Sequence, residues 1–247
     1  MRLTMGISPC PNDTFMFHDV AAGALSSDGY EVELHLHDIE TLNALALVGR
    51  YDVTKLSAAC ALKVGGTYRT LDSGGAFGFG CGPLVVARSP LAPDAVARGR
   101  VALPGENTTA HLLFRLWAPH AARRLFVPYD RIVGAVLSGE ADVGVVIHES
   151  RFVVAEAGLT RLADLGEWWE SETGLPLPLG CVAARRSLGD ATLADLDRLL
   201  RRGIAHSRAE PDATLSYVRR HAAELDDTVI RRHIALYVND YSDRLGE

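Results

Sequence analysis

Short apolar runs alternate with segments of helical pattern along almost the whole chain. Residues 2–7, 52–56 and 142–147 are apolar runs of strand length, and a helical pattern follows each of them within a few residues. This order is typical of βαβ units, in which helices join parallel strands. The 247 residues, 48% of them hydrophobic, suffice for one large core or two smaller ones. The sequence therefore predicts an α/β protein.

The pattern places each element by its apolar period and by its flanking turn residues. The expected strands are residues 2–7, 30–37, 52–56, 67–71, 84–87, 100–103, 125–127, 142–147 and 181–184. The expected helices are residues 14–24, 39–48, 57–64, 108–118, 131–138, 193–205, 211–220 and 228–238, with a further helix beginning at Glu149.

Two connectors interrupt the alternation. Residues 74–83 are rich in glycine, and residues 175–180 read Leu175-Pro176-Leu177-Pro178-Leu179-Gly180. Because the two connectors bracket a central α/β block, the chain is expected to cross from one lobe to another and return. Lobe one would comprise residues 1–83 and 182–247, and lobe two residues 84–181. In hinged binding proteins of this layout the ligand lies between the lobes, and closure excludes water.

Charge and composition exclude several classes of partner. The net charge of −6 leaves no basic field for nucleic acid or anionic lipid, so local donors must hold an anionic ligand. No apolar run is long enough to span a bilayer, and the segment before Ser8-Pro9 is too short for a secretory signal. The cysteines are far apart and form no CxxC pair. A cytoplasmic protein is expected, with the oligomeric state left open, a homodimer included.

The first candidate site is the turn that joins the first strand to the first helix. It carries four polar side chains, Ser8, Asn12, Asp13 and Thr14. In open α/β sheets ligands bind at the carboxyl ends of strands, and the N–H groups that begin a helix favour anions. The alternative is local: Asn12 or Asp13 caps the helix, and two prolines shape the turn.

Two further turns of the same kind follow. Lys55-Leu56-Ser57 ends a strand, with an ammonium and a hydroxyl on one face of the extended segment. The chain has only two lysines, Lys55 and Lys63. Thr108, Thr109 and Ala110 begin a helix whose hydroxyl and N–H groups could cradle a carboxylate. The alternatives are a surface lysine with an N-cap serine, and capping by threonine.

His148 follows the apolar run 142–147, so it is expected at the mouth of a sheet rather than in its core. Imidazole titrates close to neutral pH, so His148 is a candidate proton acceptor. The alternative is a histidine packed against the start of a helix. His35 and His37 share the polar face of their strand and are expected in solvent. No metal ligand set and no dinucleotide fingerprint is apparent, so neither a metal nor a cofactor is expected.

Several motifs of the chain occur together in one known family. They are Ser8-Pro9-Cys10-Pro11-Asn12-Asp13-Thr14-Phe15, Asp38-Ile39-Glu40-Thr41-Leu42-Asn43, Thr54-Lys55-Leu56-Ser57, Ser73-Gly74-Gly75-Ala76, Gly82-Pro83-Leu84-Val85-Val86-Ala87, Thr108-Thr109-Ala110, Ile147-His148-Glu149-Ser150-Arg151-Phe152, Gly174-Leu175-Pro176-Leu177-Pro178-Leu179-Gly180 and Tyr237-Val238-Asn239. With these motifs the sequence resembles the 1,4-dihydroxy-6-naphthoate synthases of the futalosine pathway of menaquinone biosynthesis. The chain departs from the family in ending soon after Tyr241-Ser242, where members usually continue with more helix.

The resemblance implies a two-lobed fold like type II periplasmic binding proteins, with two mixed sheets joined by a two-stranded hinge. It implies a lyase that converts cyclic dehypoxanthine futalosine, a small anionic organic substrate, to 1,4-dihydroxy-6-naphthoate with release of dihydroxyacetone. His148 matches the family's proton acceptor. Lys55-Leu56-Ser57 and Thr109-Ala110 match its substrate-binding segments.

Three rival functions share parts of this picture. Chorismate dehydratase of the same pathway resembles the same fold, and only the Ser8–Thr14 and His148 motifs speak against it. A non-catalytic solute receptor would bind a small anion without converting it. The effector domain of a transcription regulator would need a helix-turn-helix segment, which the sequence does not suggest.

Overall fold

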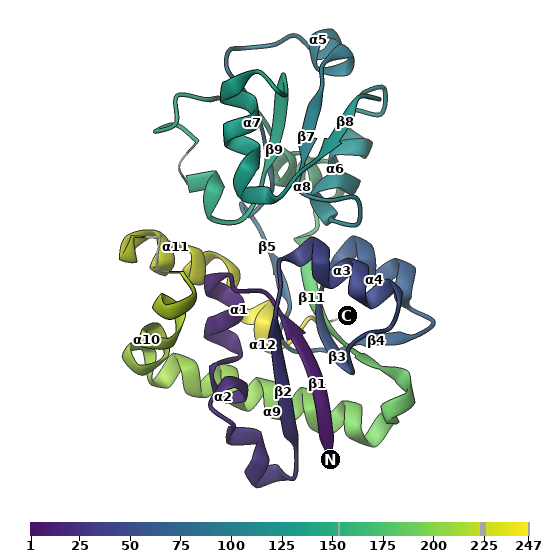
Figure 1. Cartoon of the computed structure of the whole chain (residues 1–247), viewed down its shortest axis with the longest axis vertical. Coiled ribbons are helices and arrows are strands. Elements are labelled where there is room, and N and C mark those ends of the chain that lie inside the picture. Colours follow the sequence, from purple (N-terminus) through teal and green to yellow (C-terminus); the bar gives the residue numbers. More distant parts are fainter. Residues whose placement is uncertain (153, 223–225, 247) are drawn as a thin grey trace. The chain divides into compact units, whose positions relative to one another are not determined.

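The computed structural model describes residues 1–152, 154–222 and 226–246. The chain forms two compact units (Figure 1). Unit 1 comprises Met1–Gly78 and Gly180–Glu247, and unit 2 comprises Phe79–Leu179. The chain therefore passes between the units at residues 78–79 and 179–180, whereas the boundaries expected from the sequence lie at residues 83–84 and 181–182.

Unit 1 contains a mixed sheet with the strand order β2-β1-β3-β11-β4, and β5 also pairs with β11. Strands β2 and β3 run parallel to β1, whereas β11 runs antiparallel to β3 and β4. The strands are β1 (Arg2–Ile7), β2 (Glu31–Leu36), β3 (Val53–Ser57), β4 (Tyr68–Thr70), β5 (Ala76–Gly78) and β11 (Leu177–Arg185).

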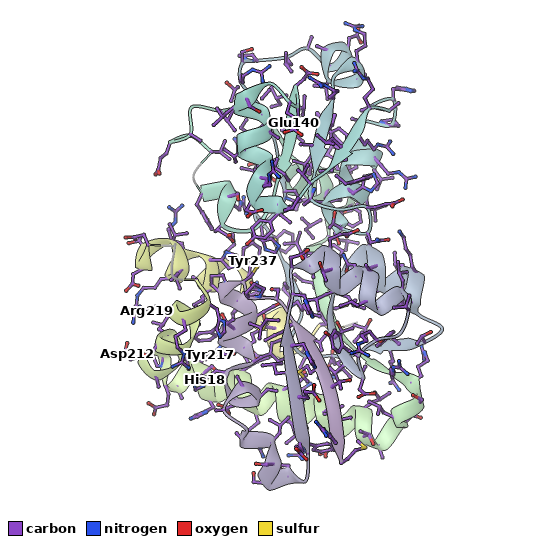
Figure 2. All side chains as sticks on the ribbon, viewed as in Figure 1. His18, Glu140, Asp212, Tyr217, Arg219 and Tyr237 are labelled. Carbon is purple, nitrogen blue, oxygen red and sulfur yellow. The ribbon has the colours of Figure 1, made fainter. Side chains whose placement is uncertain are left out.

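The helices of unit 1 share its core with the sheet. Along α9, Leu193, Leu196, Leu200 and Ile204 recur every three or four residues and pack with β1 in one apolar cluster. His18 of α2 lies beside Tyr217 of α10 (Figure 2), with ring centroids 5.6 Å apart. The helices are α1 (Pro11–Met16), α2 (His18–Ala21), η1 (Ala24–Asp28), α3 (Ile39–Leu47), α4 (Ala58–Val64), η4 (Arg186–Leu188), α9 (Asp190–Ala209), α10 (Pro211–His221), α11 (Asp227–Tyr237) and α12 (Asp240–Asp243).

Unit 2 contains a second mixed sheet, in the order β10-β6-β9-β7-β8. Strand β9 is parallel to β7 and antiparallel to β6, and a separate core of valines, alanines, leucines and Ile132 lies within the unit. The strands are β6 (Leu84–Ala87), β7 (Val101–Leu103), β8 (Arg124–Phe126), β9 (Val143–Val146) and β10 (Thr160–Asp164). The helices are α5 (Pro93–Arg98), α6 (Thr109–Trp117), η2 (Tyr129–Arg131), α7 (Ile132–Ser138), η3 (His148–Phe152) and α8 (Leu165–Thr173).

The prediction of one helix over residues 14–24 is wrong. The helix α1 begins at Pro11, and Cys10 is its N-cap residue, so neither Asn12 nor Asp13 caps it. A proline at the first position sets φ for the helix, which explains the early start. The chain then breaks at Phe17, whose φ of −102° and ψ of 16° lie outside the helical range, and α2 follows.

Other differences concern the connectors and the region after β9. The expected connector 175–180 belongs largely to β11, and β5 lies in the glycine-rich connector. The helix expected from Glu149 is a five-residue 3-10 helix, η3. The elements α5, β10, α8 and α12 were not expected. In the described part of the chain, no helix has both the length and the apolar character needed to cross a membrane.

Candidate active site

Four expected site residues form a buried polar network within unit 1: Ser8 follows β1, and Asn12, Asp13 and Thr14 lie in α1. The Ser8 hydroxyl donates to Asp13 Oδ2 at 2.7 Å, and Asn12 Nδ2 donates to Asp13 Oδ1 at 2.9 Å. The Thr14 hydroxyl donates to the carbonyl oxygen of Cys10 at 3.0 Å. The Asp13 carboxylate thus accepts hydrogen bonds from two neighbouring side chains, and these bonds fix the conformation of the segment from Ser8 to Thr14.

Lys55 joins this network from β3. Its Nζ lies 2.9 Å from Asp13 Oδ1 and donates to the carbonyl oxygen of Gly74 at 3.0 Å. The Lys55 side chain is 4% exposed and that of Asp13 is 2% exposed, so the alternative of a surface lysine is wrong. The physical reason is the position of β3, which lies between β1 and β11 in the sheet. The charge of Lys55 is therefore balanced inside unit 1 by Asp13.

Leu56 and Ser57 complete the segment. The Leu56 side chain is fully buried in a core cluster of unit 1. Ser57 precedes α4 but its side chain does not cap that helix. Instead, Asn43 of α3 donates from Nδ2 to Ser57 Oγ at 3.0 Å and accepts from the Ser57 N–H at 2.9 Å. Ser57 is thus held by one amide group on a neighbouring helix.

Thr108 and Thr109 begin α6 in unit 2. Thr108 is the N-cap residue: its Oγ1 accepts from the His111 N–H at 3.2 Å and donates to the carbonyl oxygen of Gly105 at 2.9 Å. The capping interpretation of Thr108 is therefore confirmed. Thr109 Oγ1 donates to the carbonyl oxygen of Leu179 at 2.8 Å.

Ala110 is buried in the first turn of α6, which has nine residues. The first N–H groups of a helix have no partner within that helix, and they carry the positive end of its dipole. An anion at this end would meet donors that do not depend on the protein's net charge. Binding of a substrate by Thr108, Thr109 and Ala110 stays a prediction.

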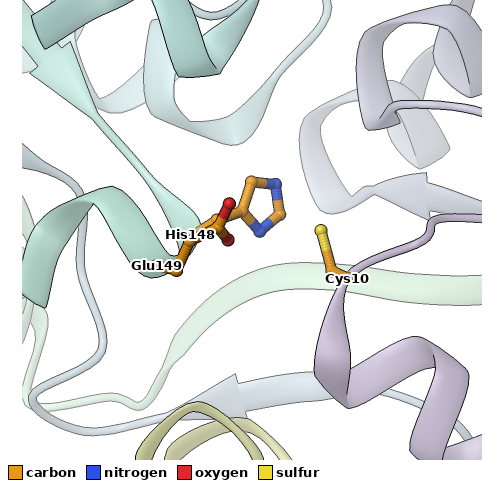
Figure 3. Close-up of side chains that lie close together, drawn as sticks. All are labelled: Cys10, His148 and Glu149. Atoms are coloured by element: carbon orange, nitrogen blue, oxygen red, sulfur yellow. The ribbon is translucent and has the colours of Figure 1, made fainter. Parts of the chain in front are cut away.

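His148 lies two residues beyond β9 and begins η3 (Figure 3), and Glu149 follows it in the same helix. Its φ is 55°, and it is the one non-glycine residue of the described chain with a positive φ. Histidine is among the residue types that occur more often in this left-handed region, which is otherwise costly. The Tyr129 ring lies edge-on to the imidazole, with centroids 5.0 Å apart. The imidazole is half-buried.

The two histidines of β2 do not lie in open solvent as expected. His37 Nε2 is 2.8 Å from the Tyr51 hydroxyl, and His35 Nε2 is 3.1 Å from a carboxylate oxygen of Glu33. Both rings also contact the ring of Tyr51, and both are half-buried. Strand β2 is the edge of its sheet, but the ring of Tyr51, two residues before β3, packs against both histidines of this polar face.

The expected residues form one set in each unit. Ser8, Asn12, Asp13, Thr14, Lys55, Leu56 and Ser57 belong to unit 1, and Thr108, Thr109, Ala110 and His148 belong to unit 2. Cys10, drawn with His148 and Glu149 in Figure 3, is the N-cap residue of α1 in unit 1.

Sequence reasoning missed several residues that hold these sets in place. His233 of α11 lies with Nε2 2.9 Å from Asn12 Oδ1, and Asn43 binds Ser57. Asn43 stands in one of the family motifs, which was a usable signal. No local pattern marks His233, because its contact with Asn12 joins residues far apart in the sequence.

Comparison with known proteins identifies the family. The family model described as menaquinone biosynthesis matches residues 3–247. The chain belongs to this family. It is 49% identical over 249 residues to a protein of Thermus thermophilus named 1,4-dihydroxy-6-naphtoate synthase, covering 99% of this chain and 89% of that one. A protein of the same name from Streptomyces coelicolor is 44% identical, with coverage of 99% and 88%. The resemblance drawn from the motifs is confirmed.

Solved structures support the fold. A protein from Archaeoglobus fulgidus has a TM-score of 0.92 at 36% identity, covering 100% of this chain and 91% of that one. The alkanesulfonate-binding protein SsuA from Xanthomonas axonopodis pv. citri has a TM-score of 0.72 at 13% identity, with coverage of 96% and 84%. At that identity the second likeness shows the fold alone. Together with the two mixed sheets, these likenesses confirm the predicted periplasmic-binding-protein-like α/β fold.

Proposed function

We propose that the chain is a 1,4-dihydroxy-6-naphthoate synthase, a carbon–carbon lyase of menaquinone biosynthesis. Its substrate would be cyclic dehypoxanthine futalosine, and its products 1,4-dihydroxy-6-naphthoate and dihydroxyacetone. The observation that carries the proposal is similarity over 99% of the chain to two proteins with that name, at 49% and 44% identity.

We also propose a cytoplasmic location, since the cysteines of the described chain are thiols rather than disulfides.

His148 is the proposed general base. It is half-buried and has a left-handed backbone conformation two residues after the central strand β9. A backbone conformation that costs free energy persists only where the surroundings enforce it, and such residues cluster at functional sites. An imidazole in this position can remove a proton from a bound substrate and later return it.

The proposed chemistry divides one molecule into two without an oxidant or a reductant. His148 takes a proton from the substrate, and the electron pair of that bond moves into the ring system. The carbon–carbon bond to the three-carbon fragment then breaks, its electron pair leaves with the fragment, and the fragment takes up a proton. The gain in aromatic character of the naphthoate ring drives the cleavage.

The substrate's negative charge would be met by neutral donors. The N–H groups at the start of α6 and the Ser57 hydroxyl are the proposed donors. The Thr108 and Thr109 hydroxyls already donate to the carbonyl oxygens of Gly105 and Leu179, so these two residues would contact the substrate through their N–H groups. Asp13 and Gly74 already take two of the three donors of the Lys55 ammonium, so at most one of them is left for the substrate. Because the charge of Lys55 balances that of Asp13, the segment from Ser8 to Thr14 presents no net negative charge to an anionic substrate.

Product identification tests the proposal. Purified protein is incubated separately with cyclic dehypoxanthine futalosine and with chorismate, and the products are identified by mass. We expect 1,4-dihydroxy-6-naphthoate and dihydroxyacetone from the first substrate and no turnover of the second. Dehydration of chorismate would identify the sister enzyme of the pathway instead, and binding without turnover of either compound would identify a receptor.

The variant His148→Asn tests the base. Asparagine tolerates a positive φ, so the backbone at residue 148 can keep its conformation while the titratable group is lost. We expect kcat to fall by about 100- to 10,000-fold, the usual contribution of a positioned acid or base. The matched control is His120→Asn, the same change at an exposed residue of unit 2. Turnover of His148→Asn at the wild-type rate would remove His148 from the mechanism.

A further inference from the structure

The helix that carries His148 is too short to hold its own position. The 3-10 helix η3 has five residues, none of them fully buried. Short 3-10 segments have poor hydrogen-bond geometry, and isolated helices of this length are unstable in water. Contacts from its side chains to the rest of unit 2 must therefore fix η3, and with it the imidazole of His148.

Arg151 makes such contacts to two separate segments of unit 2. Its Nη1 donates to the carbonyl oxygen of Gly80 at 2.9 Å, and its Nη2 lies 3.5 Å from Asp164 Oδ2. The Arg151 side chain is 11% exposed and that of Asp164 is 3% exposed. A guanidinium can bind two acceptors at once because its donors form a rigid planar fork.

Both partners of Arg151 are themselves held. Asp164 Oδ1 caps α8 by accepting from the N–H groups of Gly166 and Glu167, at 2.8 and 3.2 Å. The Gly80 N–H donates to Glu170 of α8 at 2.7 Å. Gly80 is thus held through its N–H by α8 and through its carbonyl by η3. Arg151 therefore ties η3 to the beginning of α8 and to the segment by which the chain enters unit 2.

We propose that Arg151 is a positioning residue that holds η3 against α8 and Gly80, and so sets the orientation of His148. The proposal rests on the proposed function, in which His148 is the base. Arg151 and His148 lie three residues apart on the same helical turn, so a rotation or fraying of η3 would displace the imidazole. Displacement of a reacting group by about 1 Å can cost on the order of 100-fold in rate.

The test compares Arg151→Gln and Arg151→Lys with the control Arg161→Gln. Arg161 pairs with Glu167 of the same helix α8, but both side chains are more than half exposed, at 55% and 64%. For Arg151→Gln we expect kcat to fall by about 10- to 100-fold with KM changed less than about threefold. Arg151→Lys should fall between wild type and Arg151→Gln, since one ammonium cannot replace the fork. Arg161→Gln should keep both constants.

Hydrogen exchange supplies a readout that does not depend on activity. In Arg151→Gln the amides of residues 148–152 should exchange at least about tenfold faster, while those of β7 and β9 keep their protection. Unchanged exchange over residues 148–152 overturns the proposal. A raised KM with unchanged kcat also overturns it, because Arg151 would then bind the substrate directly. If His148→Asn stays fully active, the proposed base is lost, but the exchange experiment still tests the anchoring of η3.

Discussion

Lys55 is a buried cation with acceptors on two different segments of unit 1. Its Nζ contacts the Asp13 carboxylate of α1 and the carbonyl of Gly74, and both charged side chains are at most 4% exposed. Removing a charge from water costs several kcal/mol, and a buried pair repays this cost only with good geometry and further hydrogen bonds. Asp13 has those bonds, from Ser8 and Asn12. The loss of one partner should therefore cost more than the loss of both.

The variant Lys55→Met tests this asymmetry. It leaves the Asp13 carboxylate buried without its counter-charge, so we expect the free energy of unfolding to fall by about 3–5 kcal/mol. The double variant Asp13→Asn/Lys55→Met should be less destabilised than Lys55→Met alone. Urea unfolding followed by far-UV circular dichroism measures both.

The matched control is Lys63→Met, the same substitution at the chain's other lysine, which is exposed. It should change the free energy of unfolding by less than about 0.5 kcal/mol. A double variant destabilised as much as Lys55→Met, or more, would contradict the buried-pair account.

At the residue scale, the sequence could place side chains at strand ends but could not pair them. The run before His148 predicted its position after a central strand, and the end of β3 predicted Lys55 and Ser57. The pairing of Lys55 with Asp13 depends on where α1 packs against β3, 42 residues apart in sequence. No local pattern in the sequence predicts the positive φ of His148.

At the element scale, strands were easier to predict than the helices around them. The bounds of β1 and β6 agree with the expected ranges, because turn residues mark one end of each largely apolar run: Ser8-Pro9 follow β1 and Gly82-Pro83 precede β6. Strand β10 was missed because its sequence, Thr-Arg-Leu-Ala-Asp, is mixed and only its last residue is fully buried. Helix α8 was missed because charged residues interrupt its apolar face.

The start of α8 packs directly on the chain that precedes β6. A Cβ atom on Gly82 would lie 2.1 Å from the backbone nitrogen of Gly166 and 2.4 Å from its Cα, so only glycine allows this approach. The same start of α8 contributes the N–H groups that Asp164 caps. The contact between Gly82 and Gly166 is therefore part of the frame that holds Arg151.

We expect Gly82→Ala to destabilise unit 2 by at least about 1–3 kcal/mol, since the Cβ atom meets backbone that cannot rotate away. The control is Gly134→Ala in α7, where an added Cβ meets nothing within 4 Å. That change should stabilise the unit by about 0.5–1 kcal/mol, because alanine favours a helix interior more than glycine does. Urea unfolding followed by tryptophan fluorescence measures both variants. Equal stability of the two variants would contradict the close approach.

At the scale of the whole molecule, unit 2 can be followed by a spectroscopic signal of its own. The chain has three tryptophans, Trp117, Trp168 and Trp169, and all of them lie in unit 2. Tryptophan fluorescence therefore reports the unfolding of unit 2, whereas far-UV circular dichroism reports both units. The division of the chain allows a pH effect in one unit to be separated from effects in the other.

Unit 2 contains a histidine that should make it less stable in acid. His111 of α6 is 5% exposed, and burial lowers the pKa of its imidazole. The positive charges of Arg124 and Arg115 also lower this pKa, whereas the hydrogen bond to the Glu106 carbonyl and the Glu106 carboxylate raise it. Because the pKa of His111 is lower in the folded state than its value of about 6.5 in the unfolded chain, the unfolded chain binds more protons at this residue than the folded protein does once the pH falls below about 6.5. The contribution of His111 is therefore fully present above pH 6.5 and is lost as the pH falls toward its folded-state pKa.

The variant His111→Asn should reduce this loss. Its amide can still donate to the Glu106 carbonyl oxygen, which lies 2.8 Å from His111 Nδ1, but it cannot take up a proton. We expect the urea midpoint of tryptophan fluorescence to fall between pH 7.5 and pH 5.5 in the wild type, and to fall less in His111→Asn. The control His120→Asn, at an exposed position of the same unit, should follow the wild type. Because the wild type and both variants contain the same unit 1, titration of the histidines in that unit affects all three proteins equally. An equal fall of the midpoint in all three proteins would show that His111 is not the group whose protonation weakens unit 2.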